Sequence, residues 1–283
     1  MQSLWMLAAS FLFACMGVCV KFAAATHSAV EITFYRSFIS LILMFGLVRL
    51  HRVSLVTPYW RWHLTRGVVG FSALFAYFYA ITLLPLATAV TLNYTSAIFL
   101  AIYLALAGTK LRIGILGALA LGLIGVVLLL KPTFHAEQLL GGLIGLGSGA
   151  LAGMAYFSVR ELGARGEPEM RTVFYFSLVA SVCAMVVLSF GEIHTVNLEN
   201  GLILLGVASF ATLAQLAMTR AFTRGKTMLS AALAYSTVIF SSLFGAFFWG
   251  EVLDASAWIA VALIILSGIA ATHFSRASPV EQD

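Results

Sequence analysis

Two stretches of this chain have a similar sequence pattern. Residues 89–99 read AVTLNYTSAIF, and residues 230–240 read SAALAYSTVIF. At one fixed offset a leucine, a tyrosine, an isoleucine and a phenylalanine coincide, and two hydroxyl residues follow each tyrosine. The offset is close to half of the 283-residue chain. This spacing predicts that one structural unit occurs twice.

The composition predicts that most of the chain lies in lipid. Hydrophobic residues make up 61% of the sequence and charged residues only 10%, whereas a soluble domain has about 25% charged residues. Mean hydropathy is +1.02 and the net charge is +5. The basic residues lie between apolar runs, which favours a role in membrane orientation over nucleic-acid binding. We expect the lipid bilayer as a partner and no nucleic acid.

Ten apolar segments are long enough to cross a bilayer, which takes about 20 residues per helix. The first has no Lys or Arg before it, so we interpret it as a membrane helix and not as a signal peptide. The sequence therefore predicts an all-α integral membrane protein with ten transmembrane helices. They are expected at residues 3–23, 29–48, 65–83, 86–107, 112–130, 139–160, 171–190, 200–220, 227–249 and 255–274.

The basic residues predict the orientation, because cytoplasmic loops carry an excess of Lys and Arg. With a cytoplasmic N-terminus, the inner loops hold thirteen of the 16 Lys and Arg residues. We therefore expect both termini in the cytoplasm, and a bacterial cytoplasmic (inner) membrane as the location. The thirteen are Arg49, Arg52, Arg61, Arg66, Lys110, Arg112, Arg160, Arg165, Arg171, Arg220, Arg224, Lys226 and Arg276.

Five spans in each half predict an inverted repeat, because an odd number makes the two copies cross the membrane in opposite senses. Secondary transporters use this plan and bind substrate near the bilayer midplane. The predicted repeats are residues 1–135 and 136–283. Tyr94 and Tyr235 each lie about 12 Å from their own membrane face at 1.5 Å per residue. We therefore expect the two rings near the middle of the bilayer.

The ten spans in two halves, the ALAYS segment at residues 232–236 and the Gly250–Glu251 pair resemble the EamA-type permeases of the drug/metabolite transporter superfamily. Glu31 and Arg36 in the second span also fit that family's pattern. The first half departs from it, with Gly108, Thr109 and Lys110 in place of a Gly-Glu pair. The resemblance implies a secondary transporter for a small organic metabolite, an amino acid or a related compound, working by export.

No enzyme signature occurs in the sequence. It lacks a phosphate-binding loop, a zinc-protease motif and a nucleophile elbow. The three cysteines lie within apolar runs and predict no metal site or disulfide. We expect no catalytic residue, no metal and no cofactor. The alternatives are a facilitative uptake permease for a vitamin or nucleoside-like solute, a membrane enzyme, a lipid flippase, or a receptor or scaffold.

Polar residues within the spans are the candidate substrate site, because ionisable groups in a membrane are costly and usually functional. Arg36 lies about 10 Å deep and could bind a carboxylate or bond to carbonyls at a helix end. Glu31 is expected to be solvated near the outer end of the same helix. The tyrosines either contact an organic solute or pack between helices. A homodimer is a further possible assembly. The predicted substrate-binding residues are Arg36, Tyr77, Asn93, Tyr94, Tyr156, Gln215, Tyr235 and Ser236.

Overall fold

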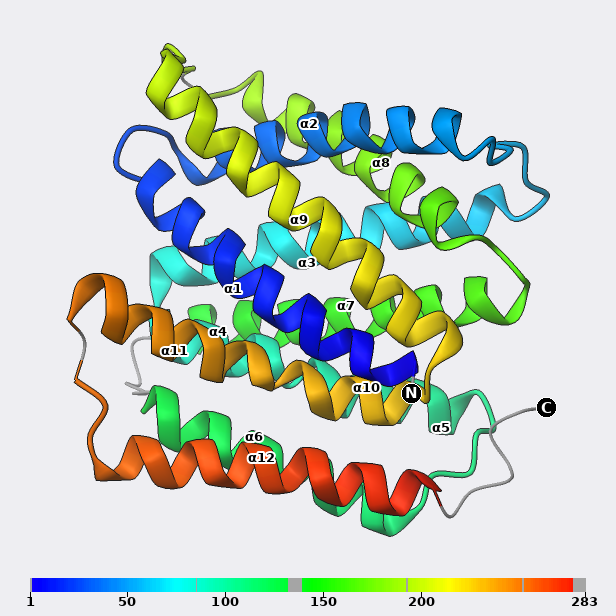
Figure 1. Ribbon diagram of the computed structural model, residues 1–283, viewed down its shortest axis with the longest axis vertical. Coiled ribbons are helices and arrows are strands. Elements are labelled where there is room, and N and C mark those ends of the chain that lie inside the picture. Colours follow the sequence, from blue (N-terminus) through cyan, green and yellow to red (C-terminus); the bar gives the residue numbers. More distant parts are fainter. Residues whose placement is uncertain (1, 85, 132–138, 192, 251, 277–283) are drawn as a thin grey trace.

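A computed structural model describes residues 2–84, 86–131, 139–191, 193–250 and 252–276. Within these ranges every regular element is a helix. The helices form one bundle, and α1 begins at the same end of it at which α12 ends, on the right in Figure 1. The helices are α1 (Trp5–Ala23), α2 (Ala29–Leu50), α3 (Trp60–Leu83), α4 (Leu86–Tyr94), α5 (Ser96–Leu106), α6 (Ile113–Leu130), α7 (Leu139–Ala164), α8 (Glu169–Leu188), α9 (Leu198–Arg224), α10 (Thr227–Ala234), α11 (Ser236–Trp249) and α12 (Ala255–Arg276), preceded by the short η1 (Gln2–Leu4).

The predicted all-helical membrane fold is confirmed. In the described part of the chain, nine helices are long and apolar enough to cross a membrane, with α4–α5 and α10–α11 each forming one span. The one predicted span not among these nine, residues 65–83, corresponds to α3, which has 24 residues and is long enough for a hydrocarbon core of about 30 Å. The structure moves some boundaries: α3 begins at Trp60 instead of residue 65, and α9 extends to Arg224 instead of residue 220.

The helices pack in pairs that cross between the two halves of the chain. The most extensive contacts join α3 to α7, α1 to α9, α2 to α8 and α6 to α12. The helix α3 also contacts α8, and α9 also contacts α2. In Figure 1 the helices α2 and α8 lie at one side of the bundle, and α6 and α12 lie at the other. Neither half is therefore a separate globule.

Two of the spans are broken at the repeated stretch. The first span breaks at Thr95, between α4 and α5, and the second breaks at Tyr235, between α10 and α11. Thr95 Oγ1 donates to the carbonyl of Leu92 at 2.5 Å, and Ser236 Oγ donates to the carbonyl of Leu233 at 2.6 Å. A hydroxyl that bonds back to the preceding turn competes with the backbone ladder and bends a helix. The same chemistry therefore accompanies the break in both copies.

Glycines on α7 bring that helix close to the first break. A Cβ atom on Gly149 would lie 2.6 Å from the carbonyl oxygen of Leu92, and one on Gly153 would lie 2.8 Å from that of Ser96. Small residues allow this approach between helices in lipid. The second break has a similar neighbour, because a Cβ on Gly122 of α6 would lie 2.5 Å from the ring of Tyr235. These glycines therefore permit close packing against both breaks.

Candidate functional site

A cavity of about 690 Å³ lies inside the bundle. Its lining comes from most of the helices and is largely apolar, with residues of both halves on its wall. Ligand sites in proteins are commonly concave and apolar with a few polar groups that orient the ligand. The polar lining residues are Thr33, Arg36, Arg66, Tyr77, Asn93, Tyr94, Ser96, Tyr156, Gln215, Tyr235, Thr237, Ser241 and Ser242.

The two tyrosines of the repeated stretch meet in this cavity. The ring centroids of Tyr94 and Tyr235 are 6.0 Å apart, with the ring planes at 54°. The Tyr235 side chain is fully buried, and its hydroxyl has no hydrogen-bond partner among the described residues. Because each tyrosine adjoins a helix break, the breaks bring two distant parts of the chain to one wall.

Two buried arginines also line the cavity. Arg36 on α2 is 8% exposed and Arg66 on α3 is 4% exposed. Within the described ranges, Nε of Arg36, and Nε and Nη1 of Arg66, are buried and have no hydrogen-bond partner. Among the described residues on the cavity wall there is no aspartate or glutamate. The cavity therefore holds two cations with no carboxylate from this part of the chain to balance them.

The guanidinium of Arg66 lies between Phe176, which it contacts, and Gly70, which leaves space for it. Its central carbon lies 4.2 Å from the ring centroid of Phe176, which is a cation–π contact. A Cβ atom on Gly70 would collide with Nη1 of Arg66, so the glycine one turn further along α3 leaves room for this group. The guanidinium thus lies along α3 in the direction of the bundle centre.

Other polar groups of the cavity have protein partners that fix them on the wall. Asn93 Nδ2 donates to Ser148 Oγ at 3.2 Å, which holds the amide of Asn93 against α7. The ring of Tyr156 stacks on Phe222 with centroids 5.0 Å apart. Tyr94, Tyr77 and Tyr156 line the same cavity. Together these residues form an aromatic wall that carries hydroxyl and amide groups.

The structure brings seven of the eight predicted residues to the cavity. They are Arg36, Tyr77, Asn93, Tyr94, Tyr156, Gln215 and Tyr235. The eighth, Ser236, is not on the wall; its hydroxyl bonds to Leu233 at the helix break instead. Its position differs because a serine hydroxyl within a helix reaches the preceding turn more readily than the space beyond it.

Sequence reasoning missed Arg66, which it counted among the charges that orient the chain. Arg66 lies near the start of α3, where a basic residue normally anchors a helix at the membrane surface. The glycine four residues later, Gly70, is the one sequence signal that could have indicated an inward guanidinium. Only the packing of Phe176 against Arg66 distinguishes the two interpretations.

The expectation that Glu31 is solvated is wrong. Its side chain is 0% exposed and accepts hydrogen bonds from the backbone nitrogens of Ser28 at 2.7 Å and His194 at 2.6 Å. Nδ1 of His194 also lies 2.9 Å from this carboxylate. Glu31 therefore caps α2 and links the segment before α9 to that helix. Glu31 is not among the residues that line the cavity.

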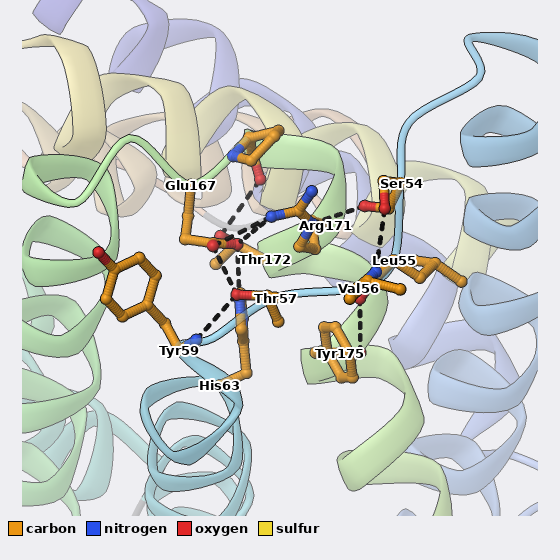
Figure 2. A network of polar contacts seen from close by, with 11 residues as sticks. Ser54, Leu55, Val56, Thr57, Tyr59, His63, Glu167, Arg171, Thr172 and Tyr175 are labelled. Carbon is orange, nitrogen blue, oxygen red and sulfur yellow. Dashed lines mark hydrogen bonds and ion pairs between the residues drawn. The ribbon is translucent and has the colours of Figure 1, made fainter.

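A polar network joins several elements at the end of the bundle where α3 begins (Figure 2). Glu167 accepts hydrogen bonds from Thr57 at 2.6 Å and from Arg171 at 3.0 Å, and its carboxylate lies 2.9 Å from Nε2 of His63. Burial favours the neutral acid, but these contacts outweigh burial and hold the pKa of Glu167 below its usual value. Glu167 thereby ties residues 51–59 to α3 and α8.

An all-helical bundle that crosses the membrane many times and encloses a chamber with polar groups on its wall has the architecture of a membrane transporter. The EamA-like transporter family matches residues 1–131 and 139–272. The chain belongs to this family, and it is a transporter and not an enzyme.

Known proteins resemble the chain over nearly its whole length. The pseudopaline exporter CntI of Pseudomonas aeruginosa strain UCBPP-PA14 is 32% identical over 269 residues, covering 95% of this chain and 94% of CntI. An uncharacterized transporter of Helicobacter pylori strain J99 is 28% identical, covering 93% and 91%. A solved structure described as "Crystal structure of protein" has the same fold, with a TM-score of 0.85 and 21% sequence identity. The match covers 97% of this chain and 98% of the chain in that structure.

Proposed function

We propose that the chain is a secondary transporter that exports a small organic metabolite, an amino acid or a related compound, across a bacterial inner membrane by alternating access. The observation that carries the proposal is the cavity of about 690 Å³, whose wall is built by both halves of the chain around the two helix breaks. Broken helices around a central site are a common feature of secondary transporters. The name of the relative CntI, an exporter, supports the direction.

The proposed repeats, residues 1–135 and 136–283, are supported by the way in which the helices pair. If α1, α2 and α3 are equivalent to α7, α8 and α9, the contact of α3 with α7 is equivalent to that of α9 with α1. The contact of α3 with α8 is likewise equivalent to that of α9 with α2. Such pairs are expected from a two-fold axis in the membrane plane. The proposed boundary lies outside the described residues.

Movement of one half against the other would open the cavity to each side in turn. The proposed substrate-binding residues are the seven predicted residues on the wall, together with Arg66. In this proposal both termini are cytoplasmic. A gradient of a solute or an ion drives transport, so no ATP is consumed.

Flux through proteoliposomes tests the function. Purified protein is reconstituted, and labelled solutes from a broad metabolite panel are followed with and without a proton gradient. We expect at least one solute to move faster than through protein-free liposomes. If no solute in the panel does so, the proposed function is wrong.

A cavity-filling pair of variants makes this test specific. Ala234 lines the cavity, whereas Ala8 is exposed on α1. We expect Ala234→Trp to abolish most of the flux because the indole fills the chamber, and Ala8→Trp to retain it. Equal flux in the two variants would show that transport does not pass through this cavity.

A further inference from the structure

We propose that the substrate of this cavity is an organic anion with two carboxylate groups, bound by Arg36 and Arg66. This inference rests on the proposed function, because it names the chemistry of the solute that the same cavity takes. Both guanidinium groups line one cavity and both are more than nine-tenths buried.

The charge balance of the cavity supports a doubly charged ligand. Burying an unpaired cation is costly, and proteins normally pair such groups with an opposite charge. Nε of Arg36, and Nε and Nη1 of Arg66, have no hydrogen-bond partner among the described residues, and no acidic side chain of the described ranges lies on the wall. The two guanidiniums are also close enough to repel each other. A dianion would neutralise both groups and remove this repulsion.

Two arginines on different helices are suited to bind the two carboxylates of one organic ligand. A guanidinium presents a planar fork of donors that matches the two oxygens of a carboxylate. Arg36 comes from α2 and Arg66 from α3, so two such forks enter the chamber from different helices. The volume of about 690 Å³ has room for a carbon skeleton between two acidic groups. The tyrosine rings and the amides of Asn93 and Gln215 are suited to contact that skeleton.

Gly70 acts as a positioning residue for this binding. Its missing side chain leaves the space that Nη1 of Arg66 occupies, and the ring of Phe176 covers the other side. A methyl group at residue 70 would displace the guanidinium from its present position. The two-arginine arrangement thus depends on a glycine one helical turn away.

A series of isosteric probes tests the charge requirement. Succinate, adipate and suberate are compared with their half-amides and diamides, which have nearly the same size and shape. Binding to the purified full chain in detergent is measured by calorimetry at constant ionic strength. We expect a dicarboxylate to bind about 10- to 100-fold more tightly than its half-amide, the range of one charge-assisted hydrogen-bonded contact. Equal binding of the three forms, or no binding of any dicarboxylate, overturns the proposal.

Variants connect this preference to the two arginines. Arg36→Gln and Arg66→Gln should each reduce the preference for dicarboxylate over half-amide to about 10% or less of its original value. Gly70→Ala should reduce it in the same way while Arg66 is still present. The control Arg112→Gln changes an exposed arginine before α6, outside the cavity lining, and should leave the preference intact. An unchanged preference in both Arg36→Gln and Arg66→Gln overturns the proposal.

Stability of the empty protein provides a second readout. If these arginines bind a ligand and do not stabilise the fold, Arg66→Met should raise the unfolding temperature. The reason is that an apolar side chain avoids the cost of a buried, unpaired cation. A structural arginine would give the opposite sign, and a fall in unfolding temperature would count against the proposal.

If neutral solutes are transported and the arginine variants transport them normally, the anion proposal is wrong and the transporter function remains. If dicarboxylates bind but no solute moves, the transporter function is wrong.

Discussion

The hydroxyl of Tyr235 gives a test at the scale of a single residue. It is buried without a hydrogen-bond partner among the described residues, so Tyr235→Phe should leave the free energy of unfolding unchanged or slightly raise it. If the hydroxyl contacts substrate, the same variant should weaken binding by about 0.5–1.5 kcal/mol. Tyr235→Ala and Tyr94→Ala, which also remove an aromatic contact, should each weaken binding by roughly 1–3 kcal/mol. Substrate affinity and thermal unfolding in detergent measure the two effects.

Tyr103 is the matched control. It lies on α5, and its hydroxyl donates to the carbonyl of Ala150 at 3.2 Å, away from the cavity lining. Tyr103→Phe should lower stability by about 0.5–1.5 kcal/mol and leave substrate affinity unchanged. Normal affinity in both alanine variants, Tyr94→Ala and Tyr235→Ala, would show that the tyrosines only pack in the bundle.

Two glycines of α7 test the helix break at the scale of an element. Gly149 faces the carbonyl of Leu92, whereas a methyl group added at Gly147 would point into open space, with no neighbouring element of the described chain within 4 Å. We expect Gly149→Ala to destabilise the protein by about 1–3 kcal/mol, because the added methyl group forces α7 away from the α4–α5 break. Gly147→Ala should be neutral or stabilising by up to about 1 kcal/mol, the helix propensity difference. Thermal unfolding of the two variants decides between them, and equal unfolding temperatures would contradict the close packing.

The network around Glu167 predicts a dependence on pH. The pKa of Glu167 is lower in the folded protein, so its contribution to stability is present above the unfolded pKa of about 4.3. The contribution is lost as the pH falls through the lower folded pKa. Glu167→Gln should reduce the free energy of unfolding by about 1–3 kcal/mol at neutral pH, and the difference from wild type should shrink below about pH 4.

Unfolding temperatures of wild type and Glu167→Gln across this pH range test the prediction. Glu199, which is exposed near the start of α9, supplies the control. Glu199→Gln should change stability little at any pH, because an exposed carboxylate is already solvated. A difference between wild type and Glu167→Gln that does not vary with pH would show that the charge of Glu167 is not what stabilises the network.

The orientation of the whole molecule can be tested with single cysteines in a background that lacks Cys15, Cys19 and Cys183. Cysteines at Arg52, Arg165 and Arg276 should react with a reagent applied from the cytoplasmic side. Those at Ser28 and His194 should react from outside, because the distribution of basic residues predicts this orientation. Labelling with membrane-impermeant maleimide measures both. The reverse pattern at any two cytoplasmic positions would contradict the predicted topology. A third predicted external position, His135, lies outside the described residues.

At the scale of the whole molecule, packing between the halves unites the helix breaks with the two arginines. The arginines come from α2 and α3, and the tyrosines come from the repeated stretch in each half. The contacts of α1 with α9 and of α3 with α7 interleave the two halves. A shift of one half would therefore alter the surroundings of the arginines and the tyrosines together, as the proposed alternating access requires.

The sequence by itself determined the membrane class, the helices, the family resemblance and seven of the polar residues on the cavity wall. Composition and apolar length suffice for the helices, because a bilayer requires each segment to satisfy its own backbone hydrogen bonds. A repeated motif at half the chain length was enough to direct attention to Tyr94 and Tyr235.

Only the tertiary structure decided which polar groups face the cavity. Local sequence does not say that Glu31 is buried against His194, or that Arg66 turns inward to pack on Phe176 beside Gly70. Each of these outcomes depends on a partner or on room supplied by a neighbouring turn or a distant helix. Burial and pairing are properties of packing between elements, whereas hydropathy and periodicity are properties of one segment alone.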